Sequence, residues 1–487
     1  MRSLRAEDAS SDLSRRTVLL GFGLLVLLPQ IAAMVWLPVI PVMADTAHFF
    51  DMTRAFAPSG PVDPLVLRPG ALLEEHFAYL PGYPIFLDLC KLFVPVRHLG
   101  RLVVAVQHLM SFATAVLIWR AGRHAGWPRA GLAAALTYGV YYPRVFHAQS
   151  LHYETPLALL FTLSVHLFLR FMREGRLAVL AACGAALGAA FWIKPVVLAA
   201  VPVFLWTLLA RRADRRAVSL FVAFAAATVG SVFFYNTVFR QYPHFTTFVG
   251  WHLGNRVFGR DRLVDPTDPN TRFIVETLRG TPAADRFPGH TAGYIPVFQD
   301  RSGLSGVQAD RVVLGAALAA VRAHPGAYAW GTVKAFRGFF GGSGDRLGMQ
   351  AYDPGRFQEL LRRVREREKT FALGSVPRRL SWYAIDLRGF RLSWDRSVWL
   401  RRWHGLFRSR VFFAVRLAAL AAAGLVALRR RQRVLRLLIA LAAAVLLASA
   451  LTEASQARYA EMLMPLFCLI VWAPLGGVLD RDGRAAA

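Results

Sequence analysis

The stretch TVLLGFGLLVLLPQIAAMVWLPVIPVMADTAHFFDMTRAF, residues 17–56, decides the class of this protein. Its first part, residues 17–40, is an apolar run that is long enough to cross a hydrocarbon core of about 30 Å as a helix. The run ends at Pro38 and Pro41, and an acid, Asp45, follows directly. The pattern predicts a membrane span that leads into a polar, acid-bearing loop.

The composition of the whole chain agrees with a membrane protein. Of its 487 residues, 55% are hydrophobic and only 30 are acidic, and the mean hydropathy is +0.38, which is too apolar for a soluble protein of this length. The formal charge of +28 comes from arginines clustered between apolar blocks. Such clusters favour membrane lipids over nucleic acid as the partner. Cys90, Cys183 and Cys468 lie far apart in apolar surroundings, so no disulfide or metal framework is predicted.

The predicted fold is an all-α polytopic membrane protein with about ten transmembrane helices. After the first span, further apolar segments lie at 99–120, 129–143, 152–171, 177–193, 195–210, 216–239, 411–428, 434–452 and 460–479. An alternative for the first segment is a cleaved twin-arginine signal, suggested by Arg15-Arg16 before the run. The run is longer than the apolar part of a signal, about 7–15 residues, and this favours a retained span.

Arginine-rich loops orient the predicted spans, because short cytoplasmic loops carry an excess of positive charge. Those around 120–129, 170–176, 211–216 and 429–436 all fall on one side if the spans alternate. Both termini are then cytoplasmic and the protein lies in the bacterial inner membrane. The predicted divisions are a tail at 1–16, a catalytic core at 17–239 with a first external loop at 41–96, an external periplasmic segment at 240–410, C-terminal spans at 411–479 and a tail at 480–487.

The two external regions are predicted to contain helices of their own. In the first loop, juxtamembrane helices are expected after Asp45 and after the bend at 79–84. The long segment between spans seven and eight is predicted to be a mixed external region. It contains a helix at 308–323, a second and basic helix at 328–340, and an interfacial helix at 399–410 with alternating Trp and Arg.

Isolated polar residues gather at the external ends of the predicted spans. Ionisable groups at membrane depth are costly and are usually paired or functional, so their common side predicts one polar cavity. Asp45 fits a general base, although it could also cap the helix that follows it. Lys194 and Arg458 fit a phosphate-binding pair, although Lys194 could instead snorkel to the interface. The other candidate substrate-binding residues are Glu75, His76, Tyr83, Glu154 and Tyr459. No ligand spacing for a metal is visible.

Several segments in order resemble one family, the membrane-embedded C-type glycosyltransferases that use polyprenyl-phosphate sugars. This family includes protein O-mannosyltransferases and aminoarabinose transferases. The segments that carry the resemblance are ADTAHFFDMTRAF (44–56), LPGYPIFLDL (80–89), HAQSLHYETPLALLFTLSVHLFLR (147–170), GAALGAAFWIKPVVLAAVP (184–202), WHLGNRVF (251–258), ADRVVLGAALAAVRAHPGAYAWGTVKAF (309–336) and QARYAEMLMPLF (456–467). Thr46 and Ala47 depart from the family's usual pair after the first acid.

The resemblance implies a transfer reaction at the external membrane face. Asp45 would act as the catalytic base, Glu154 would lie near a sugar, and Lys194 and Arg458 would bind the lipid-linked phosphate. The donor would be a polyprenyl-phosphate sugar and the acceptor a glycan, lipid or protein. No cofactor beyond this donor is expected, although a divalent metal is not excluded. The alternatives are a lipid or solute transporter and an O-antigen ligase or polymerase type of enzyme.

Overall fold

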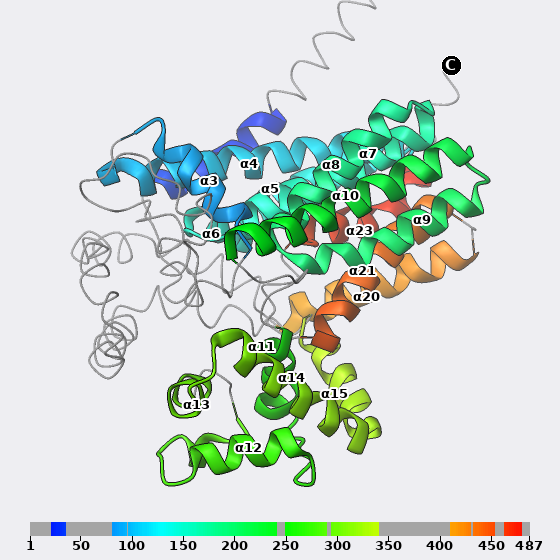
Figure 1. Ribbon diagram of the computed structural model, residues 1–487. Helices are drawn as coiled ribbons and strands as arrows, with labels where there is room; N and C mark the ends of the chain where they lie inside the picture. Colours follow the sequence, from blue (N-terminus) through cyan, green and yellow to red (C-terminus); the bar gives the residue numbers. More distant parts are fainter. Residues whose placement is uncertain are drawn as a thin grey trace, which may run out of the picture.

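The computed structural model describes residues 21–35, 80–94, 96–240, 249–289, 294–339, 410–429, 432–452 and 462–479. These residues form helices, joined by short turns, and contain no β-strand. The helices gather into two units, a large bundle and a smaller unit of short helices beside one end of it (Figure 1). Each unit has its own cluster of buried apolar side chains.

Apolar helices make up the bundle, and four of them are long and apolar enough to span a membrane, namely His98–His124, Glu154–Glu174, Arg215–Val238 and Arg433–Thr452. In chain order the bundle contains Gly21–Val35, α3 (Gly82–Lys91), α4 (Val96–His124), α5 (Pro128–Val140), α6 (Tyr142–Gln149), α7 (Glu154–Glu174), α8 (Leu177–Ile193), η3 (Pro195–Ala199), α9 (Ala200–Ala210), α10 (Arg215–Arg240), α20 (Arg410–Arg429), α21 (Arg433–Thr452) and α23 (Met464–Leu479). The protein is therefore a polytopic membrane protein whose described part is all-helical. Each predicted span overlaps one of these helices, but the number of ten crossings stays a prediction.

Close helix contacts in the bundle depend on small residues. α4 packs against α5 and α7, and α8 packs against α7 and α10. A Cβ atom added at Gly122 of α4 would lie 2.4 Å from the Cα of Gly131 in α5. Small residues at such contacts let helix backbones approach closely in a membrane, where water does not drive association. Buried aromatic side chains fill the spaces between α7, α8, α9 and α10, among them Phe168, Phe191, Phe204 and Phe221.

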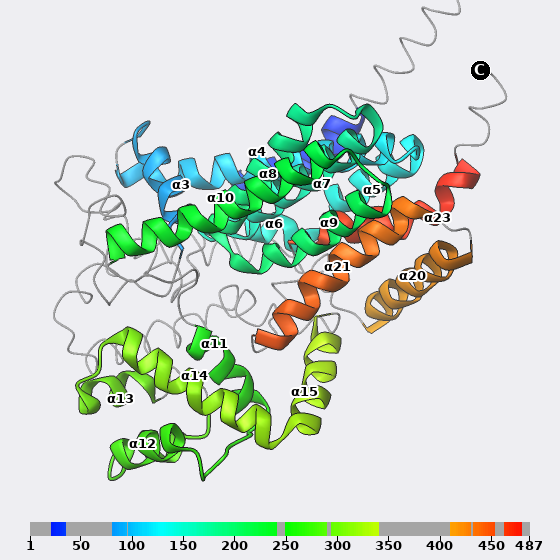
Figure 2. The ribbon, with the colours of Figure 1, turned by 45° about the vertical axis from the view of Figure 1, so that its right-hand side comes forward.

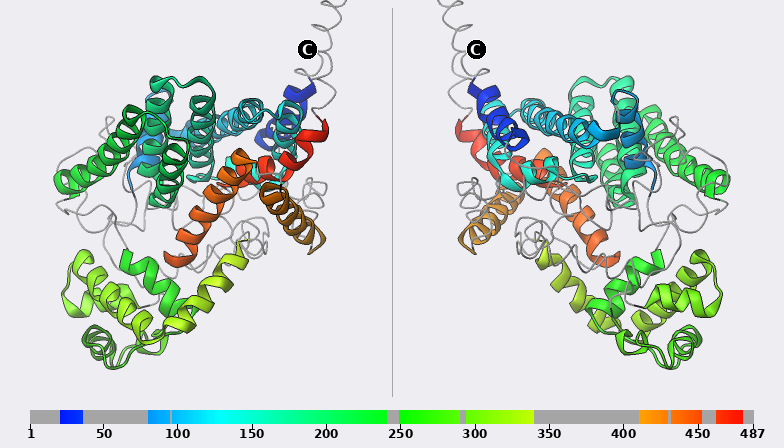
Figure 3. Two further views of the ribbon diagram at one scale, coloured as in Figure 1. Left: turned by 90° about the vertical axis from the view of Figure 1, so that its right-hand side faces the viewer. Right: turned by 90° about the vertical axis from the view of Figure 1, so that its left-hand side faces the viewer.

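The smaller unit is built from the segment that follows α10. It contains α11 (Val249–Gly254), η4 (Asn255–Arg260), α12 (Pro269–Leu278), η5 (Ala284–Arg286), α13 (Ile295–Ser302), α14 (Gly306–Ala323) and α15 (Pro325–Gly338). Figures 2 and 3 show it as a separate body beside the bundle, with α15 next to the end of α21. We call residues 249–339 of this segment, where described, the external unit, following the predicted topology.

The external unit confirms two predicted helices and changes one expectation. The helix predicted at 308–323 is α14, and it begins with a capping box in which Ser305 and Gln308 satisfy each other's backbone N–H groups. The helix predicted at 328–340 is α15, which starts earlier because Pro325 occupies its first turn. The expected mixed character is wrong for the described part, which is helical. The interfacial helix predicted at 399–410 and the helix predicted after Asp45 lie outside the described residues.

A carboxyl group without a partner lies on the buried face of α3. Asp88 is 8% exposed, and neither of its side-chain oxygens has a hydrogen-bond partner. Burial raises the pKa of Asp88 to about 7, although the positive charge of Lys91 lowers it in part. The folded protein therefore holds a proton on Asp88 at pH values where the unfolded chain has already lost it.

Asp88→Asn is expected to stabilise the protein at high pH. Because the folded pKa is raised, the wild-type protein loses stability as the pH rises from about 4, the unfolded value, to about 7. The variant lacks this loss, so its midpoint of thermal unfolding should exceed that of the wild type at pH 8 and approach it at pH 5. Asp300→Asn on the exposed side of α13 is the control. If the midpoints of thermal unfolding of the variant and the wild type differ by the same amount at pH 5 and pH 8, the interpretation of Asp88 is wrong.

Candidate active site

Polar side chains from four neighbouring segments meet where α7 begins. Glu154 is in the first turn of α7, where the positive end of the helix dipole favours a carboxylate. The Nδ1 atom of His152 is hydrogen-bonded to Oε2 of Glu154, and the two side chains are only 1% and 5% exposed. A buried carboxylate is costly unless it is paired. The short turn between α6 and α7 thus holds an imidazole–carboxylate pair.

Tyr83 approaches this pair from α3. Its hydroxyl donates a hydrogen bond to Oε1 of Gln107 in α4, over 3.1 Å. The amide group of Gln107 in turn donates to the carbonyl oxygens of Ala148 (3.0 Å) and Ser150 (2.6 Å), which fixes the turn before His152. Burial, followed by the negative charge of Glu154, raises the pKa of Tyr83 well above its ordinary value. The phenol therefore stays protonated and keeps its hydrogen bond to Gln107.

The position of Tyr83 follows from the bend LPGYP at 80–84. Gly82 begins α3 against the end of α8, and a Cβ atom there would lie 2.6 Å from the carbonyl oxygen of Trp192. Only glycine permits this approach without a shift of the backbone. The bend therefore brings Tyr83 close to the residues that lead into Lys194.

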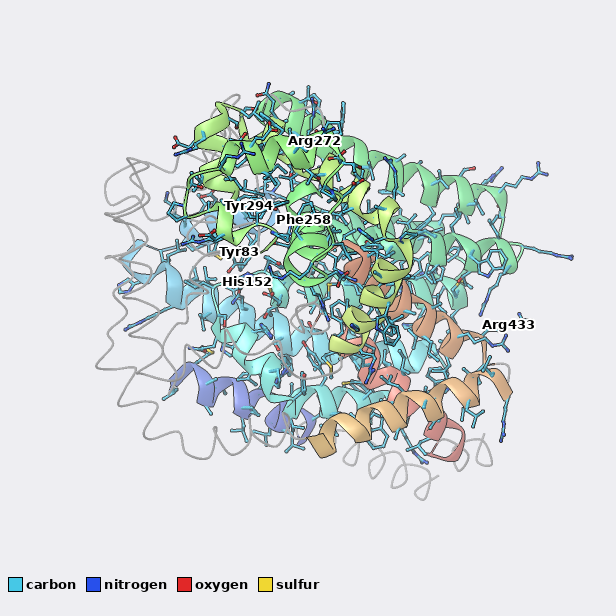
Figure 4. All side chains as sticks on the ribbon, turned by 90° about the horizontal axis from the view of Figure 1, so that it is seen from below. Tyr83, His152, Phe258, Arg272, Tyr294 and Arg433 are labelled. Atoms are coloured by element: carbon cyan, nitrogen blue, oxygen red, sulfur yellow. The ribbon has the colours of Figure 1, made fainter. Side chains whose placement is uncertain are left out.

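Lys194 completes the group from the end of α8. Its backbone is extended, with φ −147° and ψ 119°, because the residue before a proline avoids the helical region. The Nζ atom lies 5.7 Å from the ring centroid of Tyr153, and that ring is 4.1 Å from the ring of His152. Lys194, Tyr153, His152 and Glu154 therefore form one continuous cluster. Figure 4 shows Tyr83 and His152 on the same part of the bundle.

A second buried network supports this cluster from behind. His108 of α4 is hydrogen-bonded through Nε2 to Oε1 of Gln149 (2.8 Å) and through Nδ1 to the amide of Gln30. With the Gln30 amide oriented so that its nitrogen donates to His108, its oxygen accepts from Arg144. Arg144 also donates to the carbonyl oxygen of Gly139 over 2.6 Å. These bonds hold α6, and so the turn that carries His152, on α4 and on the helix Gly21–Val35.

The structure brings together the described part of the predicted site. Tyr83, which the sequence placed in the first external loop, meets Glu154 and Lys194, which it placed at the external ends of two spans. The other predicted site residues lie outside the described residues, namely Asp45, Glu75, His76, Arg458 and Tyr459. Within the described ranges, no group of three or more His, Cys, Asp or Glu residues could hold a metal ion.

Sequence reasoning did not assign roles to His152, Tyr153 and Gln107. The signal for Gln107 and His108 was available, since two adjacent polar side chains within an apolar span are unusual. For Tyr153 no signal was available, because its role depends on the approach of Lys194 from another helix. His152 and Glu154 are two positions apart in the chain. Their side chains meet because of a turn between α6 and α7 that the sequence alone does not define.

Tyr83→Phe is expected to lower stability by about 1–3 kcal/mol, because it deprives a buried amide oxygen of its donor. Thermal unfolding of the protein in lipid nanodiscs measures this effect. Tyr294→Phe is the matched control, since Tyr294 is equally buried but its hydroxyl has no hydrogen-bond partner. The control should unfold at the wild-type temperature or above it. Equal losses in both variants would show that the Tyr83–Gln107 bond contributes nothing.

Comparison with known proteins gives a family match for part of the chain. Residues 84–239 match the model of a family described as dolichyl-phosphate-mannose-protein mannosyltransferase, and the matched segment contains Glu154 and Lys194. The match confirms, for this segment, the resemblance to membrane-embedded glycosyltransferases that use polyprenyl-phosphate sugars. It covers less than half of the chain.

One solved structure gives a match over a longer range. It is the crystal structure of ArnT from Cupriavidus metallidurans bound to undecaprenyl phosphate, with 17% sequence identity over 95% of this chain and 80% of that chain. The TM-score is 0.35, so the two backbones agree too little overall for the match to establish a common fold. No curated protein sequence gives a significant match.

Proposed function

We propose that this protein is a membrane glycosyltransferase that moves a sugar from a polyprenyl-phosphate carrier to an acceptor hydroxyl at the external membrane face. The observation that carries the proposal is the cluster of Tyr83, His152, Glu154 and Lys194 at the start of α7, most of it within the segment that matches the family. A cation, a carboxylate and a protonated phenol at one place suit a substrate that contains both a phosphate and sugar hydroxyls.

Lys194 is proposed to bind the phosphate of the donor. A lysine ammonium is a compact point charge that suits a phosphate oxygen. Arg458 is the proposed second cation, because its planar guanidinium can contact two phosphate oxygens at once. Together they would stabilise the negative charge that develops on the phosphate as the bond to the sugar breaks.

Asp45 is proposed as the general base. The acceptor oxygen forms a bond to the anomeric carbon while the bond from that carbon to the phosphate oxygen breaks. The hydroxyl proton passes to the Asp45 carboxylate, and polyprenyl phosphate leaves with the electron pair. One displacement of this kind inverts the configuration at the anomeric carbon.

The His152–Glu154 pair has a primary and an alternative assignment in this scheme. As the primary assignment, Glu154 and the hydroxyl oxygen of Tyr83 accept hydrogen bonds from the sugar, and Glu75, His76 and Tyr459 line the approach. The pair is also a second candidate for the base, because a carboxylate orients the imidazole of His152. Replacing Asp45 and Glu154 separately distinguishes the two assignments.

The proposed site faces the periplasm and both termini are cytoplasmic. The support is the arginine pattern of the loops, which puts the ends of α3, α6 and α8 on the side opposite to the arginine-rich loops. The predicted domain limits follow from this orientation. The donor lipid would reach the site from the outer leaflet, and the acceptor would be a glycan, lipid or protein. No cofactor is part of the proposal.

Mass spectrometry of envelope glycans and lipids tests the function. Cells that lack the protein should lose one glycosylated species and accumulate its unmodified acceptor, and the wild-type gene should restore it. A Lys194→Gln gene should not restore it. Unchanged glycans and lipids, together with a change in the uptake of a solute or lipid, would favour the transporter alternative.

A further inference from the structure

We infer that Arg256 is a positioning residue for the proposed transfer, since it links the external unit to the Lys194 cluster through the end of α21. This inference rests on the proposed function. Arg256 is in η4, directly after α11, and is 62 or more residues from every residue of the candidate site in the chain. Its guanidinium bonds to residues other than Lys194 and Glu154. Arg256 would act through α21, because both the external unit and η3 pack against this helix.

Arg256 is fully buried and its guanidinium bonds in three directions. Nε donates to the carbonyl oxygen of Ala450 in α21 over 3.0 Å, and Nη2 lies 3.3 Å from Oγ1 of Thr332 in α15. Nη1 forms an ion pair with Asp261. The guanidinium also lies over the ring of Tyr328, with its carbon 5.3 Å from the ring centroid. A fully buried charge is stable only with such partners, so the arrangement fixes η4, α15 and α21 relative to one another.

The contacts on α21 involve backbone carbonyl groups in its last described turn. Arg256 bonds to the carbonyl oxygen of Ala450, and the hydroxyl of Tyr328 donates to that of Leu451. Two side chains of the external unit therefore hold the end of α21. The chain continues from there towards Arg458, which follows Thr452 by a few residues in the sequence.

α21 also packs against the segment that begins after Lys194. α21 contacts both η3 and α9. Val197 of η3 and Val445 and Ala450 of α21 are buried in the same apolar cluster. Since η3 starts at Pro195, a shift of the end of α21 would move the backbone that carries Lys194. Figure 2 shows α21 running from the bundle to α11 and α15.

Within the external unit, the start of α11 is held closely against α14. The carboxylate of Asp310 in α14 accepts hydrogen bonds from the N–H groups of Gly250 (3.1 Å) and Trp251 (2.7 Å) at the start of α11. A Cβ atom at Gly250 would lie 2.0 Å from the carbonyl oxygen of Asp310, so the two helices touch by their backbones. In addition, Ala335 and Phe339 of α15 pack into the core of the bundle. The link is therefore a packed connection and not a flexible one.

Arg256→Lys and Arg256→Gln test the inference in the full-length protein, reconstituted in lipid nanodiscs. Lysine keeps the charge but cannot bond in three directions. In both variants, amide hydrogen exchange should increase in residues 445–452 and also in 194–199. The KM for a lipid-extracted polyprenyl-phosphate sugar should rise at least about tenfold, as the loss of a charged hydrogen bond in a coupled site predicts. Exchange in α12 should stay at the wild-type rate.

Two further variants keep the test decisive. Arg272→Gln is the matched control, since Arg272 is an exposed arginine of the same unit that donates to the carbonyl oxygen of Thr267 (3.0 Å), and it should change neither readout. Tyr328→Phe removes only the bond to Leu451 and should give a smaller change of the same kind, even if the Arg256 variants do not fold. Faster exchange that stops at 445–452, with wild-type exchange in 194–199 and wild-type KM, would overturn the inference. If the wild-type protein transfers no sugar, the proposed function fails, while the exchange data still decide the link.

Discussion

Asp45→Asn is expected to abolish sugar transfer, with turnover lowered by about 10²–10⁴-fold, while the lipid donor still binds. The reason is that asparagine cannot accept the proton that the acceptor hydroxyl loses as it attacks, and a positioned base contributes an effect of this size. The two residues are nearly equal in volume, so the cavity should keep its shape. Turnover and donor binding are measured separately, by product formation and by retention of a labelled lipid on the purified protein.

Two matched variants show whether the effect belongs to Asp45. Asp51→Asn changes another acid of the same loop and should leave turnover within a few-fold of the wild type. Glu154→Gln should raise the KM more than it lowers turnover, because Glu154 is assigned to hold the sugar. If Glu154→Gln alone loses turnover and Asp45→Asn keeps it, the base is the His152–Glu154 pair and the assignment of Asp45 is wrong.

Lys194→Gln is expected to weaken donor binding by about 10–100-fold, which corresponds to the loss of a hydrogen bond to a charged group. Turnover should fall as well, because the phosphate gains negative charge as it leaves and Lys194 is proposed to stabilise that charge. The measurement is the dependence of the transfer rate on donor concentration in nanodiscs of fixed lipid composition.

Lys334→Gln is the control for Lys194, because both lysines lie over an aromatic ring. The Nζ atom of Lys334 is 5.8 Å from the ring centroid of Trp330 in the external unit, and that of Lys194 is 5.7 Å from the ring of Tyr153. Lys334→Gln should leave the KM unchanged. If Lys194→Gln instead lowers only the yield of inserted protein, Lys194 anchors the helix end at the interface and does not bind the phosphate.

The helices of the bundle could be predicted from the sequence, because a long apolar segment has few alternatives to a helix in a membrane. The helix α14 could be predicted in the same way, since its apolar stripe and its end at 324–326 are local signals. What could not be predicted was how the external unit packs. The described part of the segment that was expected to be mixed is helical, and turn residues such as Asp265 and Asp268 lie between its helices.

The candidate site could be predicted only in part. Glu154 and Lys194 stood out because a single charged residue within apolar sequence is costly. Arg256 did not stand out, since it lies in an aromatic, turn-rich external segment that contains several other arginines. Its role depends on the carbonyl group of Ala450, 194 residues away in the chain. Such long-range contacts involve backbone groups that every residue has, so the sequence carries no local signal for them.

The most direct test of the central claim is a transfer reaction with the purified protein in nanodiscs. The protein is incubated with lipid-extracted polyprenyl-phosphate sugars and the acceptor fraction from cells that lack it, and mass spectrometry follows both products. The wild-type protein should form one glycosylated acceptor and an equal amount of polyprenyl phosphate, while Asp45→Asn should form neither and keep the donor intact. No release of polyprenyl phosphate by the wild-type protein, or wild-type release by Asp45→Asn, would contradict the account.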